Sequence, residues 1–246
     1  MARAGGLGPR RVERATPFAR IPFVDHPQHS EPFLLRLGGV SAAVIALGYV
    51  AIMALYVPMG APPLGAEAKL RYIGANATAW WWILGLSVLT DFLFIPVSAA
   101  LYDVLARYNR AAMLMSTACI ALFVLLDLAL TWTNYAVLIA LSTPSASAAA
   151  MPAAAYATLV VESGLLFVYN TLTLAIGLLI SGWVMRRARF GRITAWVGIA
   201  TGCLGIVSVA GPVFTSSLSP AIIVTSVLTT VWLLLTGVRL CQLSRA

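Results

Sequence analysis

Charged residues are scarce in this chain of 246 residues. They make up 10% of the sequence, whereas hydrophobic residues make up 61% and the mean hydropathy is +0.92. An ordinary soluble domain carries about 25% charged residues. A soluble fold of this length could not bury so much apolar surface, so the composition predicts an integral membrane protein.

Residues that hold cofactors inside membranes are also rare. The two histidines, His26 and His29, both precede the first long apolar run, so no histidine can ligate a haem or a metal within the membrane. Lys69 is the only lysine and lies between apolar runs, which excludes a retinal Schiff base. The three cysteines are far apart and show no CxxC spacing, so a disulfide framework is not expected. We therefore predict no cofactor and no metal.

Catalytic motifs are absent as well. The sequence contains no GxSxG, HExxH, Walker-type glycine loop or dinucleotide fingerprint. It therefore assigns no catalytic residue. Acid catalysis by carboxyl groups alone remains open as a chemistry.

Long apolar runs dominate what is present. A membrane span needs about 20 mostly apolar residues, and six segments qualify. These are Leu34–Val57, Trp80–Tyr102, Ala111–Leu141, Tyr156–Met185, Ile193–Gly211 and Ala221–Leu240. The sequence thus predicts an all-α membrane protein, a polytopic bundle of six transmembrane helices over residues 34–246. Residues 1–33 carry a twin arginine but no compact apolar segment with a cleavage site, so we expect them to form a retained, basic cytoplasmic tail.

The distribution of basic residues predicts the orientation. In a six-helix arrangement every basic residue except Lys69 and Arg71 falls on one side of the membrane. Positively charged segments stay cytoplasmic, so both termini should face the cytoplasm. Topology accounts for the net charge of +8, and no nucleic-acid partner is expected. Arginine replaces lysine almost throughout and alanine is abundant, which favours a bacterial inner membrane.

Small and aromatic residues predict local contacts. Gly198 and Gly202 lie four residues apart, with Gly205 one turn further on, and such spacing lets helices approach closely in lipid. This contact could lie inside the bundle or between protomers. The run Trp80–Trp82 opens the second segment, where indole rings favour the membrane interface.

Three acids fall within the predicted spans: Asp91, Asp127 and Glu162. No lysine or arginine lies at comparable depth, so we expect no intramembrane ion pair. An ionised carboxylate at the bilayer centre costs about 2.5–3.5 kcal/mol on insertion scales. Each acid should therefore be protonated, hydrated or bound to something.

Helical spacing gives each acid polar neighbours on the same face. The candidate ligand-binding residues are Asp91, Asp127, Glu162, Ser87, Thr131, Asn134, Tyr169 and Asn170. They predict an outward-opening, acid-lined cavity between the second, third and fourth spans. Pro96 frees a backbone carbonyl beside Asp91, which would add an oxygen ligand. The same residues could instead form interhelical hydrogen bonds that only stabilise the bundle.

The stretch "YIGANATAWWWILGLSVLTDFLFIPVSAALYDVLARYNRAAML" resembles a group of small bacterial six-helix membrane proteins catalogued as a domain of unknown function. The likeness lies in the first outer loop, the second span and the turn "ALYDVLARYNRAAML", and loosely covers residues 34–240. The resemblance implies a six-helix inner-membrane protein and carries over no catalytic residues.

Three hypotheses for function follow. The first is binding or transport of a cation, a proton or a small amphiphile through the acid-lined face. The second is a structural or accessory subunit, a homo-oligomer or the partner of another membrane protein, with Gly198 and Gly202 at the contact. The third is a membrane enzyme that uses Asp127 or Glu162 as an acid on a lipid or isoprenoid and needs a large apolar pocket beside them.

Overall fold

The computed structural model describes residues 31–143, 150–162, 165–188, 190–214 and 221–245. Most of the predicted cytoplasmic tail therefore lies outside the described residues. All regular elements in these ranges are helices, so the all-α prediction is confirmed for them. The helices are α1 (Pro32–Met59), α2 (Ala66–Ala75), α3 (Ala77–Leu105), α4 (Arg110–Leu126), the π-helical turn η1 (Asp127–Trp132), α5 (Thr133–Leu141), α6 (Met151–Glu162), α7 (Leu165–Arg187), α8 (Arg192–Phe214) and α9 (Ala221–Leu243).

Five helical stretches of the described chain are long and apolar enough to cross a membrane. They are α1, α3, the continuous stretch from α4 through η1 to α5, α8 and α9, and they match five of the six predicted segments. The fourth predicted segment, Tyr156–Met185, is not one helix: α6 ends at Glu162 and α7 begins at Leu165. A Ser-Gly pair separates them in the sequence, and both residues have low helix propensity. The prediction of a single continuous helix there is wrong.

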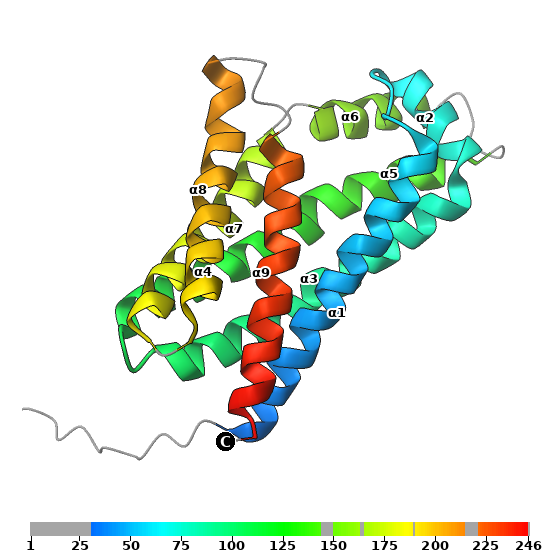
Figure 1. Cartoon of the computed structure of the whole chain (residues 1–246). Helices are drawn as coiled ribbons and strands as arrows, with labels where there is room; N and C mark the ends of the chain where they lie inside the picture. Colours follow the sequence, from blue (N-terminus) through cyan, green and yellow to red (C-terminus); the bar gives the residue numbers. More distant parts are fainter. Residues whose placement is uncertain (1–30, 144–149, 163–164, 189, 215–220, 246) are drawn as a thin grey trace, which may run out of the picture.

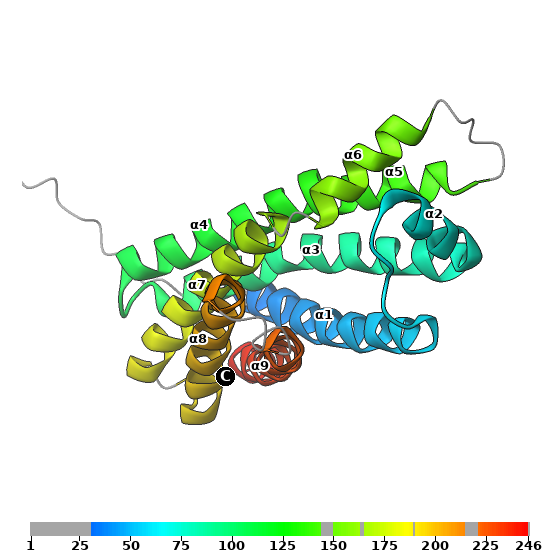
Figure 2. The same ribbon diagram turned by 90° about the horizontal axis from the view of Figure 1, so that it is seen from above.

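Six helices pack in a closed ring. Around this ring α1 contacts α3, α3 contacts α4, α4 contacts α7, α7 contacts α8, α8 contacts α9, and α9 returns to α1. Figure 1 shows α7, α8 and α9 grouped on one side, with α1 and α3 crossing obliquely beside them. The view from above places α3 between α1 and the α4–α5 stretch (Figure 2). Two short helices, α2 and α6, pack on each other and on α5 at one end of the bundle.

Local sequence explains where several helices begin and end. The Asn109 side chain accepts a hydrogen bond from the Ala112 backbone N–H at 3.1 Å, which caps the start of α4. At the end of α1, Gly60 has φ of +72°, a backbone conformation that glycine adopts without a side-chain clash. Gly191, with φ of +123°, allows the turn from α7 into α8.

The predicted glycine contact lies inside the protein, between α7 and α8. A Cβ atom added at Gly202 would lie 2.7 Å from the Ala175 carbonyl oxygen, and one at Gly198 would lie 2.6 Å from Nε1 of Trp232 on α9. Gly205 similarly approaches Ala175. Because α7 and α9 cover these glycines, the Gly198–Gly202 face is not available to a partner protein, and that part of the second hypothesis is wrong.

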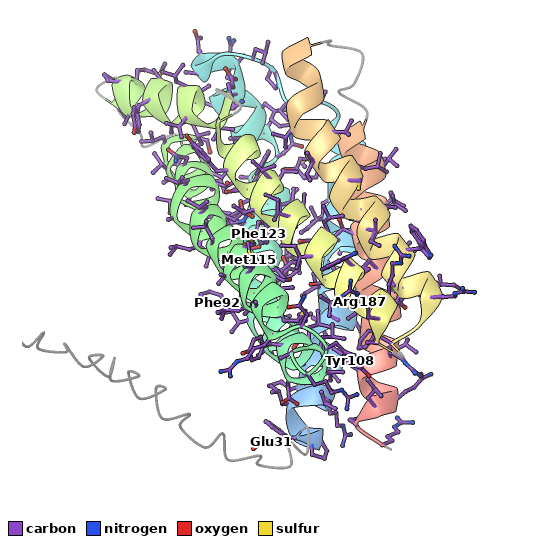
Figure 3. The ribbon with its side chains drawn as sticks, turned by 90° about the vertical axis from the view of Figure 1, so that its left-hand side faces the viewer. Glu31, Phe92, Tyr108, Met115, Phe123 and Arg187 are labelled. Carbon is purple, nitrogen blue, oxygen red and sulfur yellow. The ribbon has the colours of Figure 1, made fainter. Side chains whose placement is uncertain are left out.

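The outward surface of the ring is apolar. Phe92 on α3 is 54% exposed and Met115 on α4 is 60% exposed, whereas Phe123 is buried. Figure 3 labels the side chains of Phe92 on α3 and Met115 on α4. Exposed apolar side chains spread over full-length helices are expected where the solvent is lipid rather than water. The structure therefore agrees with a membrane protein.

All described arginines except Arg71 lie at one end of the bundle. The α3–α4 turn, the α7–α8 turn, the start of α1 and the end of α9 all lie at the end opposite α2 and α6 (Figures 1 and 3). These segments contain Arg36, Arg107, Arg110, Arg186, Arg187, Arg192, Arg239 and Arg245. Lys69 and Arg71 belong to α2 at the other end. We call these the arginine end and the α2–α6 end.

Candidate functional site

Asp91 is buried near the middle of α3. Only 2% of the residue is exposed, and its Oδ2 atom is buried without a hydrogen-bond partner among the described residues. The hydroxyl of neighbouring Thr90 donates instead to the Ser87 carbonyl oxygen at 2.8 Å. The Ser98 hydroxyl likewise donates to the backbone carbonyl of Ile95 at 2.9 Å. Asp91 is thus a buried carboxyl group with one oxygen left for a ligand or a proton.

Asp127 lies at the start of η1, where the third span departs from α-helical geometry. Single π-helical turns inside α-helices occur frequently at functional sites. Side chains of the following residues bond to the backbone here: the Thr133 hydroxyl donates to the Leu128 carbonyl at 2.9 Å, and the Asn134 amide donates to the Leu130 carbonyl at 2.6 Å. Asn134 therefore supports the local helix geometry.

Asn170 on α7 joins this turn to the neighbouring helix. Its Nδ2 donates to Oδ1 of Asp127 at 2.6 Å and to the Thr131 hydroxyl at 2.7 Å. The indole N–H of Trp132 donates to Oδ2 of Asp127 at 3.2 Å. Asn170 is 7% exposed, and its Oδ1 is buried without a hydrogen-bond partner in the described part of the chain. Asn170 and Trp132 thus both donate to Asp127, while Asn170 keeps an acceptor oxygen without a described partner.

The two aspartates form a pair. Asp91 and Asp127 lie close enough for their charges to interact, and the Trp132 indole also interacts with Asp91. Tyr49 on α1 is an electrostatic neighbour of both carboxyl groups. Trp132 and Tyr49 were absent from the sequence-based candidates. Both residues carry a polar group within an apolar run, and this is the only feature of the sequence that could have indicated them as site residues.

Basic side chains do not neutralise this pair. The two ion pairs found among the described residues are Lys69–Glu162 and Arg71–Glu67, and neither involves Asp91 or Asp127. No group of three histidine, cysteine, aspartate or glutamate side chains capable of holding a metal ion occurs in that part of the chain. The geometry is that of two carboxyl groups with amide, hydroxyl and indole neighbours.

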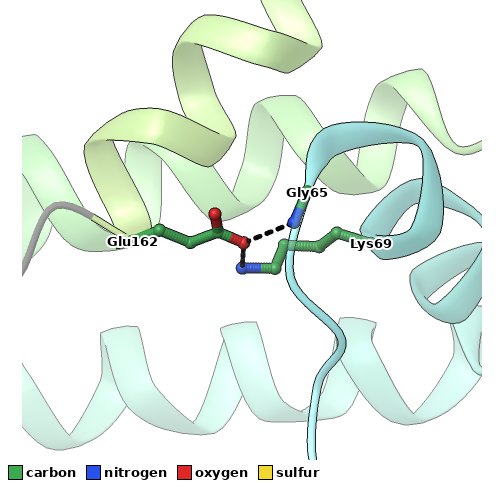
Figure 4. Close-up of polar contacts among 3 residues, drawn as sticks. All are labelled: Gly65, Lys69 and Glu162. Atoms are coloured by element: carbon green, nitrogen blue, oxygen red, sulfur yellow. Dashed lines mark hydrogen bonds and ion pairs between the residues drawn. The ribbon is translucent and has the colours of Figure 1, made fainter.

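Glu162 does not join the pair, which corrects the expectation that it has no ionic partner. Its Oε1 lies 2.7 Å from Nζ of Lys69 and accepts a hydrogen bond from the Gly65 backbone N–H at 3.1 Å (Figure 4). Lys69 comes from the connector between the first two predicted spans, which forms α2. The prediction considered only basic residues inside the spans, so it missed a lysine that reaches Glu162 from α2.

The ion pair is partly shielded from solvent. The Lys69 side chain is 6% exposed and the Glu162 side chain is 24% exposed. The hydrogen bond from Lys69, with a smaller contribution from the Gly65 N–H, holds the pKa of Glu162 below its ordinary value. Glu162 therefore fastens α6 to α2 as an ionised group.

Tyr169 is the remaining sequence-based candidate. It is 49% exposed, and its backbone carbonyl accepts a hydrogen bond from the Thr173 hydroxyl at 2.7 Å. Of the predicted set, the structure thus brings together Asp91, Asp127, Thr131 and Asn170. Ser87 and Asn134 contribute local backbone contacts beside them.

An aromatic cluster lies between the aspartate pair and the α2–α6 end. Trp80 is 1% exposed and stacks on Tyr135 with ring centroids 5.0 Å apart, and Tyr56 meets its edge at 5.8 Å. Trp132 lies 5.7 Å from Tyr135, so it links the cluster to Asp127. Of the three consecutive tryptophans, Trp81 and Trp82 are exposed, whereas Trp80 packs against Tyr56 of α1, Tyr72 of α2 and Tyr135 of α5. The interfacial position of this run stays a prediction.

Three cavities bordered by described residues lie elsewhere. One of about 110 Å³ is at the arginine end, and two of about 420 Å³ and 270 Å³ border α1. Their lining residues do not include Asp91, Asp127 or Glu162. These cavities do not provide the outward-opening acid-lined space that the sequence suggested.

Comparisons of the chain with protein-family models, curated proteins and solved structures gave no match. The resemblance to six-helix proteins of unknown function stays a prediction. In the described part of the chain, the fold and the site together define the class: an all-helical protein with several membrane-competent helices and, between them, the buried Asp91 beside the half-buried Asp127.

Proposed function

We propose that this chain is a six-helix protein of the bacterial inner membrane that binds a proton or a small monovalent cation at the Asp91–Asp127 pair, as part of a binding or transport role. The observation that carries the proposal is the buried, unpartnered Oδ2 of Asp91 beside the half-buried carboxyl group of Asp127, with no described basic side chain paired to either.

The topology rests on five spans and one further helix. With 23 residues, α7 would be about 34 Å long at a rise of about 1.5 Å per residue, which exceeds the hydrocarbon thickness of about 30 Å. Its place in the ring between α4 and α8 supports a sixth crossing. Six crossings bring both termini to the arginine end, and positively charged segments favour the cytoplasmic side.

The chemistry follows from the charge of the pair. One ionised carboxylate in the bilayer costs about 2.5–3.5 kcal/mol on insertion scales, and two adjacent carboxylates repel each other. A shared proton or one bound monovalent cation lowers the net charge of the pair from −2 to −1 and so removes the repulsion between the two carboxylates. The site therefore supports the reversible binding of one proton or one monovalent cation.

The oxygen atoms around the pair suit a small ion. Oδ2 of Asp91 and Oδ1 of Asn170 are buried acceptors without donors. Both could face a cation or a hydronium ion, whereas Asp127 is already held in place by Asn170 and Trp132. In this arrangement Asp91 is the group that exchanges the ion and Asp127 sets its electrostatic environment.

The geometry gives less support to the binding of a large amphiphile and to a membrane enzyme that acts on a lipid or isoprenoid. A large amphiphile or an isoprenoid substrate needs a sizeable pocket beside the acids, and the three cavities described above have other linings. Glu162, one of the two proposed acids for catalysis, is held as a carboxylate by Lys69. A carboxylate that is already ion-paired is a poor proton donor.

The test is ion movement in proteoliposomes that contain a pH-sensitive dye, with an imposed gradient of protons, Na⁺ or K⁺ applied separately. Asp91→Asn should abolish pH-dependent flux, and Asp127→Asn should reduce it. Asp103→Asn is the matched control, because Asp103 lies on the same helix 12 positions away at the arginine end. Equal flux in Asp91→Asn and wild-type protein would contradict the proposal.

A further inference from the structure

An apolar groove of about 420 Å³ runs along α1, on the side that meets α9, and is lined mainly by Gly39, Ala43, Leu47, Gly237 and Val238. A separate hollow of about 270 Å³ lies on the other side of α1, between α1 and α3. Val44 and Leu47 border both and are exposed, so they form the outward ridge of α1 between the groove and the hollow.

The length of the groove is close to the thickness of one leaflet of a membrane. Its lining on α1 runs from Gly39 to Leu47, 8 positions further on, which corresponds to about 12 Å at about 1.5 Å per residue. One leaflet of the hydrocarbon core is about 15 Å thick, half of about 30 Å. An extended acyl chain that begins at the arginine end would therefore fit along this groove.

Positive charge lies at only one mouth of the groove. Arg245 lines it at the end of α9. Arg36 is exposed on α1 one turn before Val40, a lining residue, and so lies on the same face. The groove's lining residues include no acid. The charges therefore complement an anionic headgroup at the membrane surface.

We propose that this groove is a specific site for an anionic phospholipid, with one acyl chain between α1 and α9 and its phosphate near Arg36 and Arg245. Arginine pairs with phosphate through two parallel N–H donors, which gives geometric preference as well as attraction. The inference uses the membrane placement of the helices and does not depend on the aspartate pair.

A second copy of the chain is a poorer occupant. A two-fold axis normal to the membrane would bring Arg36 and Arg245 of both copies to the same membrane surface. Like charges would then face each other across a contact whose described lining supplies no acid. An anionic lipid meets the same arginines with opposite charge.

Native mass spectrometry of the full-length protein tests the site. Wild-type protein in detergent is mixed with equal amounts of phosphatidylglycerol and phosphatidylcholine that carry the same acyl chains. We expect preferential retention of one phosphatidylglycerol. Arg36→Gln and Arg245→Gln should each weaken that preference about fivefold, the equivalent of about 1 kcal/mol for one basic residue at an anionic surface. Arg71→Gln, at the α2–α6 end, should leave it unchanged.

A second pair of variants tests the groove itself. Ala43→Phe fills the groove and should lower retention of both lipids several-fold, whereas Val50→Phe adds the same ring to an exposed position of α1 outside the groove and should not. Equal retention of the two lipids by wild-type protein would overturn the proposal. So would unchanged retention in Ala43→Phe, or a wild-type dimer that Ala43→Phe converts to monomers, since a second copy would then occupy the groove.

Discussion

Glu162→Gln should loosen the contact between α2 and α6 without removing its hydrogen bonds. A glutamine oxygen can still accept from Lys69 and from the Gly65 N–H, whose distances to Glu162 are 2.7 Å and 3.1 Å. The substitution therefore isolates the effect of charge. Lys69 stays charged but loses its counter-charge, and the bond from the Gly65 N–H changes from one with a charged acceptor to a neutral one. A hydrogen bond to a charged group contributes about 1.5–3 kcal/mol and a neutral one about 0.5–1.5 kcal/mol, so the change at the Gly65 bond alone gives an expected loss of about 1–1.5 kcal/mol.

The matched control is the other ion pair of α2. Arg71 and Glu67 lie 3.3 Å apart, but both side chains are 75% exposed. Exposed pairs of this kind contribute about 0.3–0.5 kcal/mol, so Glu67→Gln, with the same change of net charge, should have little effect. The contrast between the two variants depends on burial, because Lys69 is only 6% exposed.

Hydrogen exchange of the α2 amides measures this contact locally. A loss of about 1–1.5 kcal/mol makes opening about five- to tenfold more frequent, so α2 should exchange that much faster in Glu162→Gln. Equal exchange rates in Glu162→Gln and Glu67→Gln would refute the reasoning, since burial would then have no influence on the pair.

The same contact predicts a pH dependence. The folded protein holds the pKa of Glu162 below its ordinary value, so the ion pair contributes fully above the unfolded pKa of about 4.3. The contribution is lost as pH falls through the lower, folded pKa. Protection of α2, corrected for intrinsic exchange rates, should fall in acid for wild-type protein. It should fall less in Glu162→Gln.

Three further variants test helix packing and the support of Asp127. Gly202→Ala should destabilise the protein by about 1–3 kcal/mol in unfolding titrations, because the new Cβ would lie 2.7 Å from the Ala175 carbonyl oxygen. Gly85→Ala is the control: the space around Gly85 is open, so the stability of this variant should stay within about 1 kcal/mol of wild type. Ser116→Ala should cost about 0.6–1.7 kcal/mol, since that hydroxyl bonds Ser181 at 2.6 Å; a neutral result would mean that this contact adds nothing. Asn170→Leu should reduce proteoliposome flux, as it removes a donor to Asp127, and unchanged flux would argue against that support.

The sequence was sufficient for the helices but not for their contacts. Apolar runs of about 20 residues indicate spans in any tertiary arrangement, and five of six predicted segments correspond to helices of the expected length. The break between α6 and α7 was missed because hydropathy averages over a window. A short polar or flexible interruption does not lower that average enough to divide the run.

Helical periodicity placed several site residues on the right helices. Asp127 and Thr131, four residues apart, both lie near Asn170, as residues on one face should. Periodicity cannot say which faces meet, so it did not find Tyr49 or Trp132 beside the acids. Helical periodicity also did not predict the π-helical turn at Asp127, because a periodic pattern of polar residues does not distinguish a π-helical turn from an α-helical one.

The missed ion pair between Lys69 and Glu162 results from the folding of α2 outside the spans. Lys69 reaches Glu162 because α2 folds back onto α6 over a separation of 93 positions. Such a contact is not predicted when only the basic residues inside the spans are compared in depth with the acids, because Lys69 lies in α2, between two spans. Trp80 is buried partly for the same reason, since Tyr72 from α2 packs against its ring beside Tyr56 from α1.

The most direct test of the central claim is infrared difference spectroscopy of the reconstituted protein across neutral pH. If the two aspartates share a proton, wild-type protein should show the carbonyl band of a protonated carboxyl group at neutral pH in the absence of added cations, and this band should disappear in Asp91→Asn/Asp127→Asn. Asp103→Asn should retain the band. A wild-type spectrum in which every carboxyl group is ionised at neutral pH, with no bound cation, would contradict the claim.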